Sequence, residues 1–203
     1  CDWSSDVCSS DLVPVQSTLF DRSGQKEAVE QNDKAKELKI TAHNFKITED
    51  TIPGKLSPGE RINHNIEAIS MLNRVDSGER ELDISAQEVL ANYVGWGGLP
   101  EVFDESKEGQ WKGARRFLKE NLSRAEYEAA RESTLTSFYT PKTVIDSIYS
   151  TLLEMSFRNG NILEPSMGIG NFIGNLPDEM KNSKFYGVEL DSVSGRIGKL
   201  LYP

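Results

Sequence analysis

Residues 161–172 read Asn-Ile-Leu-Glu-Pro-Ser-Met-Gly-Ile-Gly-Asn-Phe. A short apolar strand runs into an acid, Glu164, and then Gly168 and Gly170 precede the start of a helix. A tight glycine turn between a strand and a helix lets a ligand approach the backbone at the helix N-terminus. A second strand, predicted over Lys184–Val188, ends in Glu189, where doubly wound sheets hold a ribose. The pattern predicts an α/β fold with a site for a nucleoside-containing cofactor.

The spacing of the glycines distinguishes between cofactors. The dinucleotide fingerprint Gly-x-Gly-x-x-Gly lacks its third glycine, because Ile173 stands there and Gly174 comes one place late. A phosphate loop needs Gly-Lys followed by Ser or Thr, and the sequence contains no such run. Both NAD-type and nucleoside-triphosphate sites are therefore disfavoured. The plain alternative is that the glycines only form a strand-to-helix turn.

The form acid-Pro-x-x-Gly-x-Gly-x-Phe, which runs from Glu164 through Pro165 to Phe172, resembles motif I of adenine-specific DNA methyltransferases that use S-adenosylmethionine. Upstream, the run Ser-Phe-Tyr-Thr-Pro at 137–141 resembles the Tyr/Phe-Thr-Pro segment that covers the methionine end of the cofactor in those enzymes. Thr140 is also a good helix N-cap, with a proline after it.

Residues 57–135 carry helical patterns. Capping boxes predict helix starts at Ser57 with Glu60, at Ser85 with Glu88, and at Ser123 with Glu126. We expect the helices that begin at these boxes to cover 57–75, to run from 85 onward and to run from 123 onward. A further helix is expected over 111–121. Further helices are predicted over 141–157, with Gly160 as its C-cap, over 170–176, and over 193–201. On the helix over 141–157 we expect an inward apolar face formed by Val144, Ile145, Ile148, Leu152 and Leu153.

The run Gly95-Trp-Gly-Gly-Leu99 is unusual. Its functional interpretation is a hinge or a base-stacking element near an active site. The alternative is a turn that terminates a helix, with Trp96 packed in the core, and we favour this because glycine commonly ends helices. His43 and His64 stand without a metal-binding pattern, so we predict surface or capping roles for them and no metal site.

The N-terminal residues differ in character from the rest. Residues 1–12 can be encoded by a nucleotide string that resembles a short-read sequencing adapter, so we exclude them, with both cysteines, from the fold. The remaining sequence then has no cysteine, as suits the bacterial cytoplasm. Residues 13–56 are polar, and we expect them to be flexible. Gln16, Leu19 and Phe20 form a Gln-x-x-Leu-Phe run that resembles the peptide by which bacterial proteins dock on the sliding clamp.

Charge and hydropathy restrict the partners. The net charge is −9, which argues against this chain forming the main DNA-gripping surface, because phosphate binding requires clusters of Lys and Arg. No apolar run approaches the roughly 20 residues of a membrane span.

From about residue 44 onward the chain is similar to the large methylase–helicase proteins of bacterial conjugative elements and phages. Four stretches carry the resemblance: 93–99, 130–135, 161–172 and 186–191. The resemblance implies an adenine-specific DNA methyltransferase, using S-adenosylmethionine and fused to a helicase, with DNA bound by other parts of the intact protein. The implied architecture is a helical region, 57–135, followed by the first β-α-β-α portion of a Rossmann-like methyltransferase domain, 136–203, with an incomplete sheet.

The resemblance also implies the cofactor contacts. Glu189 would anchor the ribose, Leu190 would contact the adenine ring, and Glu164 would hold the methionine ammonium group. The full implied set of cofactor-binding residues is Tyr139, Thr140, Glu164, Pro165, Ser166, Gly168, Gly170, Phe172, Glu189 and Leu190. The catalytic Asn-Pro-Pro-aromatic motif of such enzymes does not occur in the 203 residues. We therefore assign no catalytic residue and expect this chain, as a truncated piece, to be inactive by itself.

Two alternatives remain open. One is a piece of a methyltransferase that acts on RNA or protein. The other is a non-enzymatic binding module of the nucleic-acid machinery.

Overall fold

The computed structural model describes residues 12–13, 43–48 and 56–203. Residues 1–11 and the proposed clamp-binding run therefore lie outside the described part. The α-helices are α1 Pro58–Asp76, α2 Ile84–Ala91, α3 Gln110–Asn121, α4 Arg124–Glu132, α5 Lys142–Glu154, α6 Asn171–Gly174 and α7 Ser192–Leu201. The strands are β1 Leu12–Val13, β2 Asn161–Glu164 and β3 Lys184–Val188, and short 3-10 helices are η1 Pro100–Val102, η2 Ser133–Leu135 and η3 Asp178–Met180.

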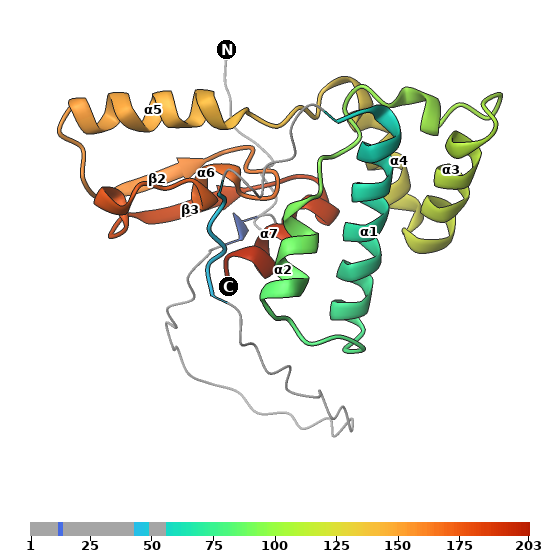
Figure 1. The fold of residues 1–203 in the computed structure, drawn as a ribbon, viewed down its shortest axis with the longest axis horizontal. Helices are drawn as coiled ribbons and strands as arrows, with labels where there is room; N and C mark the ends of the chain where they lie inside the picture. Colours follow the sequence, from blue (N-terminus) through green and yellow to red (C-terminus); the bar gives the residue numbers. More distant parts are fainter. Residues whose placement is uncertain (1–11, 14–42, 49–55) are drawn as a thin grey trace, which may run out of the picture.

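The sheet is small and β3 lies at its centre (Figure 1). Strands β2 and β3 are parallel, with Ile162 opposite Phe185, and the chain between them contains α6. This β-α-β unit, followed by α7, is compatible with an incomplete α/β fold. On the other side of β3, β1 pairs antiparallel, with Leu12 opposite Val188. Leu12, which we excluded with the adapter-like stretch, thus takes part in the sheet.

Two of the three predicted capping boxes are confirmed. At α1 the hydroxyl of Ser57 accepts from the amide of Glu60, and the carboxylate of Glu60 accepts from the amide of Ser57 at 2.8 Å. Ser123 and Glu126 form the same reciprocal pair at α4. The box at Ser85 is wrong. Helix α2 begins two residues earlier than its proposed N-cap would allow, because Asp83 accepts from the amide of Ala86 at 2.8 Å.

Helix α5 differs from its prediction at both ends. Thr140 is not its N-cap; Pro141 holds that position and makes no side-chain capping bond. The helix ends at Glu154 rather than near Gly160, because Ser156 adopts a left-handed φ of 67° and the amide of Phe157 turns back to the carbonyl of Leu152. The chain after the helix therefore turns before it reaches the predicted glycine cap.

Only part of the predicted inward face of α5 is buried. Ile145 and Tyr149 pack with Met180 in a small core, and Leu152 and Leu153 lie against it. Val144 and Ile148 are 46% and 41% exposed. Each precedes a buried residue by one position, which places it about 100° around the helix axis from that residue. Both side chains therefore lie beside the buried stripe and not within it.

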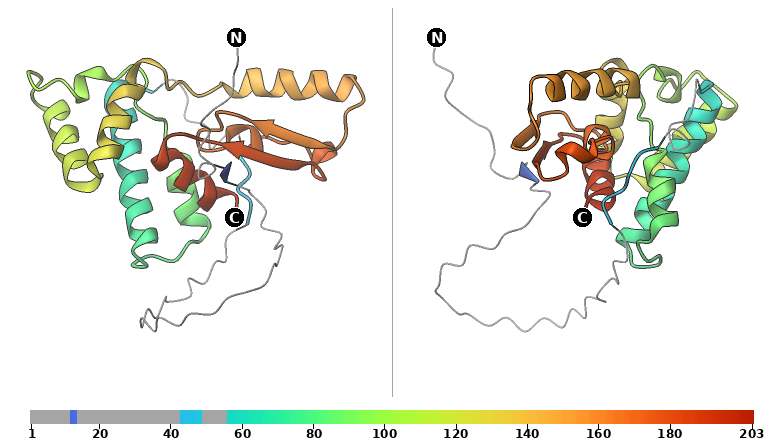
Figure 2. Two further views of the ribbon diagram at one scale, coloured as in Figure 1. Left: turned by 180° about the vertical axis from the view of Figure 1, so that it is seen from behind. Right: turned by 60° about the vertical axis from the view of Figure 1, so that its left-hand side comes forward.

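The larger core joins the helical part to the β-α-β unit. Helix α7 lies between the sheet and helices α1 and α2, as the views in Figures 1 and 2 agree. Its apolar residues Ile197 and Leu201 share one buried cluster with Leu72 of α1 and Leu90 of α2. The amide of Gln87, itself buried, donates to the carbonyls of residues 43, 200 and 201 at 2.9, 2.9 and 3.3 Å.

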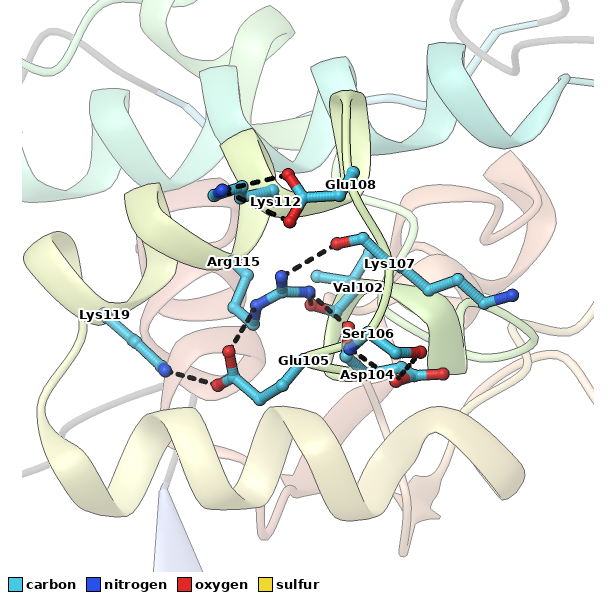
Figure 3. Close-up of polar contacts among 9 residues, drawn as sticks. All are labelled: Val102, Asp104, Glu105, Ser106, Lys107, Glu108, Lys112, Arg115 and Lys119. Carbon is cyan, nitrogen blue, oxygen red and sulfur yellow. Dashed lines mark hydrogen bonds and ion pairs between the residues drawn. The ribbon is translucent and has the colours of Figure 1, made fainter.

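A buried arginine organises the loop between η1 and α3 (Figure 3). The guanidinium of Arg115 is in a residue only 4% exposed. It donates to the carbonyls of Val102, Asp104 and Lys107 at 3.2, 2.6 and 2.9 Å and pairs with Glu105 at 3.3 Å. Arg115, which belongs to α3, thus provides hydrogen-bond donors for three backbone carbonyls between residues 102 and 107.

Within the described ranges, no helix is long and apolar enough to cross a membrane. The same residues contain no group of three or more His, Cys, Asp or Glu side chains that could hold a metal ion.

Candidate functional site

The glycine turn after β2 is fixed to the end of β3. The amide of Met167 donates to the carbonyl of Val188 at 3.0 Å, and the amide of Gly168 donates to Oε2 of Glu189 at 2.7 Å. The second carboxylate oxygen of Glu189 accepts from the amide of Asp191 at 2.9 Å. The carboxyl ends of both parallel strands are therefore drawn together, as at ligand sites of open α/β sheets.

The structure explains why both positions of the turn require glycine. Gly168 has φ +56° and Gly170 has φ +91°, in the region of positive φ that residues with a Cβ rarely adopt. A Cβ at Gly168 would also overlap the ring of Tyr139, and one at Gly170 would overlap the ring of Tyr202. Gly170 is the N-cap residue of α6.

A cleft of about 450 Å³ opens at these strand ends. Eight of the ten residues assigned to the cofactor from the sequence line it: Tyr139, Thr140, Glu164, Ser166, Gly168, Phe172, Glu189 and Leu190. Pro165 and Gly170 are not part of the lining; Pro165 is exposed beside the turn, and Gly170 is buried beneath it. The structure thus brings together residues that are more than 50 positions apart in the sequence.

One wall of the cleft has no counterpart among the predicted residues. Ala129, Glu132 and Ser133, from the end of α4 and the start of η2, face the strand ends across the cleft. Glu132 and Ser133 belong to the stretch 130–135 that carries the family resemblance, but they were not assigned to the cofactor, because their position at the cleft depends on how α4 packs against the rest of the molecule. Met167, Asn171 and Asp191 also line the cleft and were not predicted as site residues. Asp191 is the N-cap of α7, since its carboxylate accepts from the amides of Val193 and Ser194.

The cleft is acidic. Its lining, taken over the described residues, contains four carboxylates, those of Glu132, Glu164, Glu189 and Asp191, and no Lys, Arg or His side chain. Burial raises the pKa of Glu164, and a hydrogen bond from the backbone of Ser166 offsets part of that rise. A half-buried carboxylate without a cationic partner is a group that a cationic ligand would stabilise.

The ring of Tyr139 lies against the glycine turn at Gly168. Its hydroxyl lies 3.3 Å from Oγ of Ser194, which in turn donates to Asp191 at 2.5 Å. Burial raises the pKa of Tyr139, and the carboxylates of Asp191 and Glu189 raise it further, so the phenol stays neutral at physiological pH. Tyr139 also lines a second, largely apolar cavity of about 260 Å³.

Trp96 does not lie at the cleft. It is 1% exposed and meets the ring of Phe103 edge-on at 5.9 Å, so the core interpretation of this residue is confirmed and base stacking by it is excluded. His43 is exposed and His64 is half-buried on α1.

Two known proteins are similar to this chain in sequence. It is 26% identical over 166 residues to Defense against restriction protein B of Escherichia phage P1. This match covers 81% of the chain and 6% of the phage protein. The chain is 39% identical over 62 residues to type II methyltransferase M.CvrRI of Paramecium bursaria Chlorella virus XZ-6E, which covers 30% of the chain and 16% of that protein. The chain therefore spans only a small part of either relative, and the similarity indicates a relationship to methyltransferases.

No protein-family model matches the chain. No solved structure matches it either.

Proposed function

We propose that this chain carries the S-adenosylmethionine-binding part of an adenine-specific DNA methyltransferase, within a longer protein that also contains a helicase. The observation that carries the proposal is the cleft itself. It collects the glycine turn, the acid after each parallel strand and the Tyr139–Thr140 segment around one space. The similarity to a viral type II methyltransferase supports the same class, and the sequence motif supports a Rossmann-like methyltransferase fold for the β-α-β unit.

The charge of the cleft supports this cofactor over other nucleosides. Dinucleotides and nucleoside triphosphates carry phosphates, which need Lys, Arg or a free helix N-terminus. Four carboxylates without a basic residue would repel them. S-adenosylmethionine has no phosphate, and its sulfonium and ammonium groups leave it with a net positive charge. The acidic lining therefore fits this group.

Each proposed contact has a matching feature in the cleft. Both oxygens of the Glu189 carboxylate already accept one backbone N–H, and each retains a lone pair for a ribose hydroxyl. Leu190 is 92% exposed at the rim, as an apolar platform for a purine ring requires. Glu164, which has no cationic partner in the described part of the chain, would hold the ammonium group, and the backbone at Gly168 would allow the cofactor a close approach.

The bound cofactor would supply an electrophilic methyl group. Thr140 and the neutral Tyr139 would exclude water from one side of it, and the acidic lining would orient it. The exocyclic amine of the target adenine must be held by groups outside this chain, because the 203 residues contain no Asn-Pro-Pro-aromatic motif. DNA is accordingly proposed as a partner of the longer protein.

A ¹H–¹⁵N NMR titration tests the cofactor assignment, because it detects weak binding and reports where it occurs. We expect S-adenosylmethionine to shift the amide signals of Gly168, Glu189 and Leu190, and ATP and NAD⁺ to leave them unchanged. Glu189→Gln should weaken binding at least about tenfold, as loss of a charge-assisted contact does. Glu179→Gln, an exposed acid in η3, is the matched control. Equal shifts with ATP would refute the proposal.

The substrate is tested on the longer protein by mass spectrometry of nucleosides from DNA treated with it. N6-methyladenine is the expected product. A methylated cytosine, or methyl transfer to RNA or protein instead of DNA, would contradict the adenine assignment while leaving the cofactor site intact.

A further inference from the structure

The turn between α2 and η1, residues 95–99, is buried in the helical part except at Gly98. We call it the glycine–tryptophan turn. Gly95 and Gly98 have φ values of +66° and +71°, which glycine adopts without strain. Trp96 and Leu99 are each 1% exposed and anchor the turn in the core. Gly97 is not among the glycines of positive φ, so its backbone conformation does not by itself require glycine.

Helix α1 fixes the backbone of this turn from one side. The side chain of Asn65, which is fully buried, donates to the carbonyl of Gly95 at 2.7 Å and accepts from the amide of Val94 at 2.9 Å. Four residues earlier on the same face, the guanidinium of Arg61 donates to the carbonyl of Gly97 at 2.6 Å. Two side chains of one rigid helix thus determine where the turn lies.

The other side of the turn lies against the segment that leads into the cleft. The amide of Gly98 donates to the carbonyl of Thr134 at 2.7 Å. A Cβ on Gly97 would overlap the carbonyl oxygen of Ser137 and would lie 2.8 Å from its carbon. A Cβ on Gly95 would lie 3.1 Å from the ring of Tyr139. The two backbones therefore approach as closely as glycine permits.

We infer that the glycine–tryptophan turn, with Arg61 and Asn65, is a positioning element that sets the place of residues 134–140 and thereby the shape of the cofactor cleft. This inference rests on the proposed function of that cleft. Ser137, Tyr139 and Thr140 line the cleft. The turn contacts the backbone of this segment at Thr134 and Ser137 and the ring of Tyr139. The turn touches no ligand itself; it acts through the segment that it supports.

Simple core packing does not account for Gly97. A helix-terminating turn needs glycine where φ is positive, and that need is met by Gly95 and Gly98. Gly97 is instead required by its contact with the carbonyl of Ser137. The approach concerns the cleft segment and not the apolar core, so a change at Gly97 should be felt first in the cleft.

The test compares Gly97→Ala with Gly113→Ala in the full chain. Gly113 lies in α3, and a Cβ there meets nothing within 4 Å, so this variant adds the same methyl group without a contact. Hydrogen exchange of residues 134–141 and the dissociation constant for S-adenosylmethionine are measured for both. We expect Gly97→Ala to speed exchange in that segment and to weaken binding about tenfold, because binding depends on pre-organised contacts. Gly113→Ala should change neither.

A second pair of variants keeps the inference testable if Gly97→Ala does not fold. Arg61→Met removes the donor to the carbonyl of Gly97 and keeps the length of the side chain, whereas Arg61→Lys retains a donor. We expect Arg61→Met to weaken binding and Arg61→Lys to restore most of it. Arg158→Met is the control, since Arg158 donates to the carbonyl of Leu153 at 2.6 Å, away from the glycine–tryptophan turn.

The outcomes separate the two proposals. If wild-type protein does not bind S-adenosylmethionine, the proposed function fails, while faster exchange at 134–141 in the Gly97 and Arg61 variants still supports the positioning role. If the wild type binds and these variants bind equally well, the positioning role is overturned and the proposed function stands. Unchanged exchange at 134–141 overturns it as well.

Discussion

Replacing Gly168 by alanine should destabilise the protein through one identifiable contact. The residue has φ +56°, and its added Cβ would overlap Cε1 of the Tyr139 ring and lie 3.0 Å from Cδ1. The ring is held in place by its hydroxyl, which lies 3.3 Å from Oγ of Ser194. Relief of the overlap therefore requires Tyr139 to leave its place, with loss of its contact to Ser194.

The cost can be estimated in two parts. An alanine in the left-handed region costs about 1 kcal/mol relative to glycine. Displacement of a packed tyrosine, with its hydrogen bond to Ser194, costs about 2 kcal/mol more. The total of about 3 kcal/mol corresponds to a fall in Tm of roughly 6–12 °C for a chain of this size.

Urea unfolding followed by circular dichroism measures both parts. Gly78→Ala is the matched control, because Gly78 has φ +74° and a Cβ there meets nothing within 4 Å. It should cost about 1 kcal/mol, the backbone part alone. In a Tyr139→Ala background, Gly168→Ala should fall to the same cost. Equal free energies of unfolding for Gly168→Ala and Gly78→Ala, or additivity with Tyr139→Ala, would refute the reasoning.

Three further changes have defined outcomes. Asn65→Ala removes the partners of the partly buried amide of Val94 and the buried carbonyl of Gly95 and should lower the free energy of unfolding by about 3 kcal/mol, measured by urea denaturation. Arg115→Met removes the donors to three loop carbonyls and should speed hydrogen exchange over residues 102–107 by about tenfold or more. Glu126→Gln keeps the capping box but removes the ion pair with Arg196 at 2.6 Å, so it should cost about 1 kcal/mol at pH 7.

The pH dependence of the last change follows from the pKa of Glu126. Burial raises this pKa, but hydrogen bonds with Ser123 and the charge of Arg196 lower it more, so it lies below its ordinary value of 4.5. The carboxylate stabilises the fold above the unfolded-state pKa, and this stabilisation is lost as the pH falls through the lowered folded-state pKa. The cost of Glu126→Gln should therefore disappear in acid; a cost that persists at pH 2 would contradict the assignment.

Each of these changes has a control on the surface. Asn121→Ala removes an exposed amide that bonds within its own helix, and Arg116→Met removes a guanidinium whose ion pair with Glu120 spans 4.0 Å between side chains that are mostly exposed. Glu120→Gln serves for Glu126. Asn121→Ala and Glu120→Gln should leave the free energy of unfolding within about 0.5 kcal/mol of the wild type. Arg116→Met should leave hydrogen exchange over residues 102–107 unchanged. A similar loss in variant and control would mean that burial is not the cause.

Features fixed by neighbouring residues were predictable from the sequence. The boxes at Ser57 and Ser123 depend on a bond to a residue three positions away, and the strand-turn-helix around Gly168 depends on glycine conformation. The box at Ser85 was wrong for a reason that is also local, because Asp83, as good a capping residue as serine, lies two positions ahead of it and caps the helix.

Features fixed by distant residues were not predictable. The wall of the cleft at Glu132 and Ser133 depends on Arg196 of α7, which pairs with Asp76 of α1 and Glu126 of α4. No sequence pattern within α4 predicts these ion pairs of Arg196. The open side of α5 at Val144 likewise depends on what packs against the helix, since the 3.6-residue period alone does not determine how wide its buried stripe is.

The buried amide of Gln87 has a consequence for how such proteins can diverge. Its two N–H groups are shared among carbonyls of residue 43 and of the last turn of α7. A recombination event that replaced residues 57–135 with another helical segment would bring a new α2 against an unchanged α7. Unless the incoming segment carried an amide at the same place, the carbonyls of residues 43 and 200 would lose this donor, and the carbonyl of Leu201 would keep only the amide of Phe45. The helical part and the β-α-β unit should therefore be inherited together rather than exchanged as separate modules.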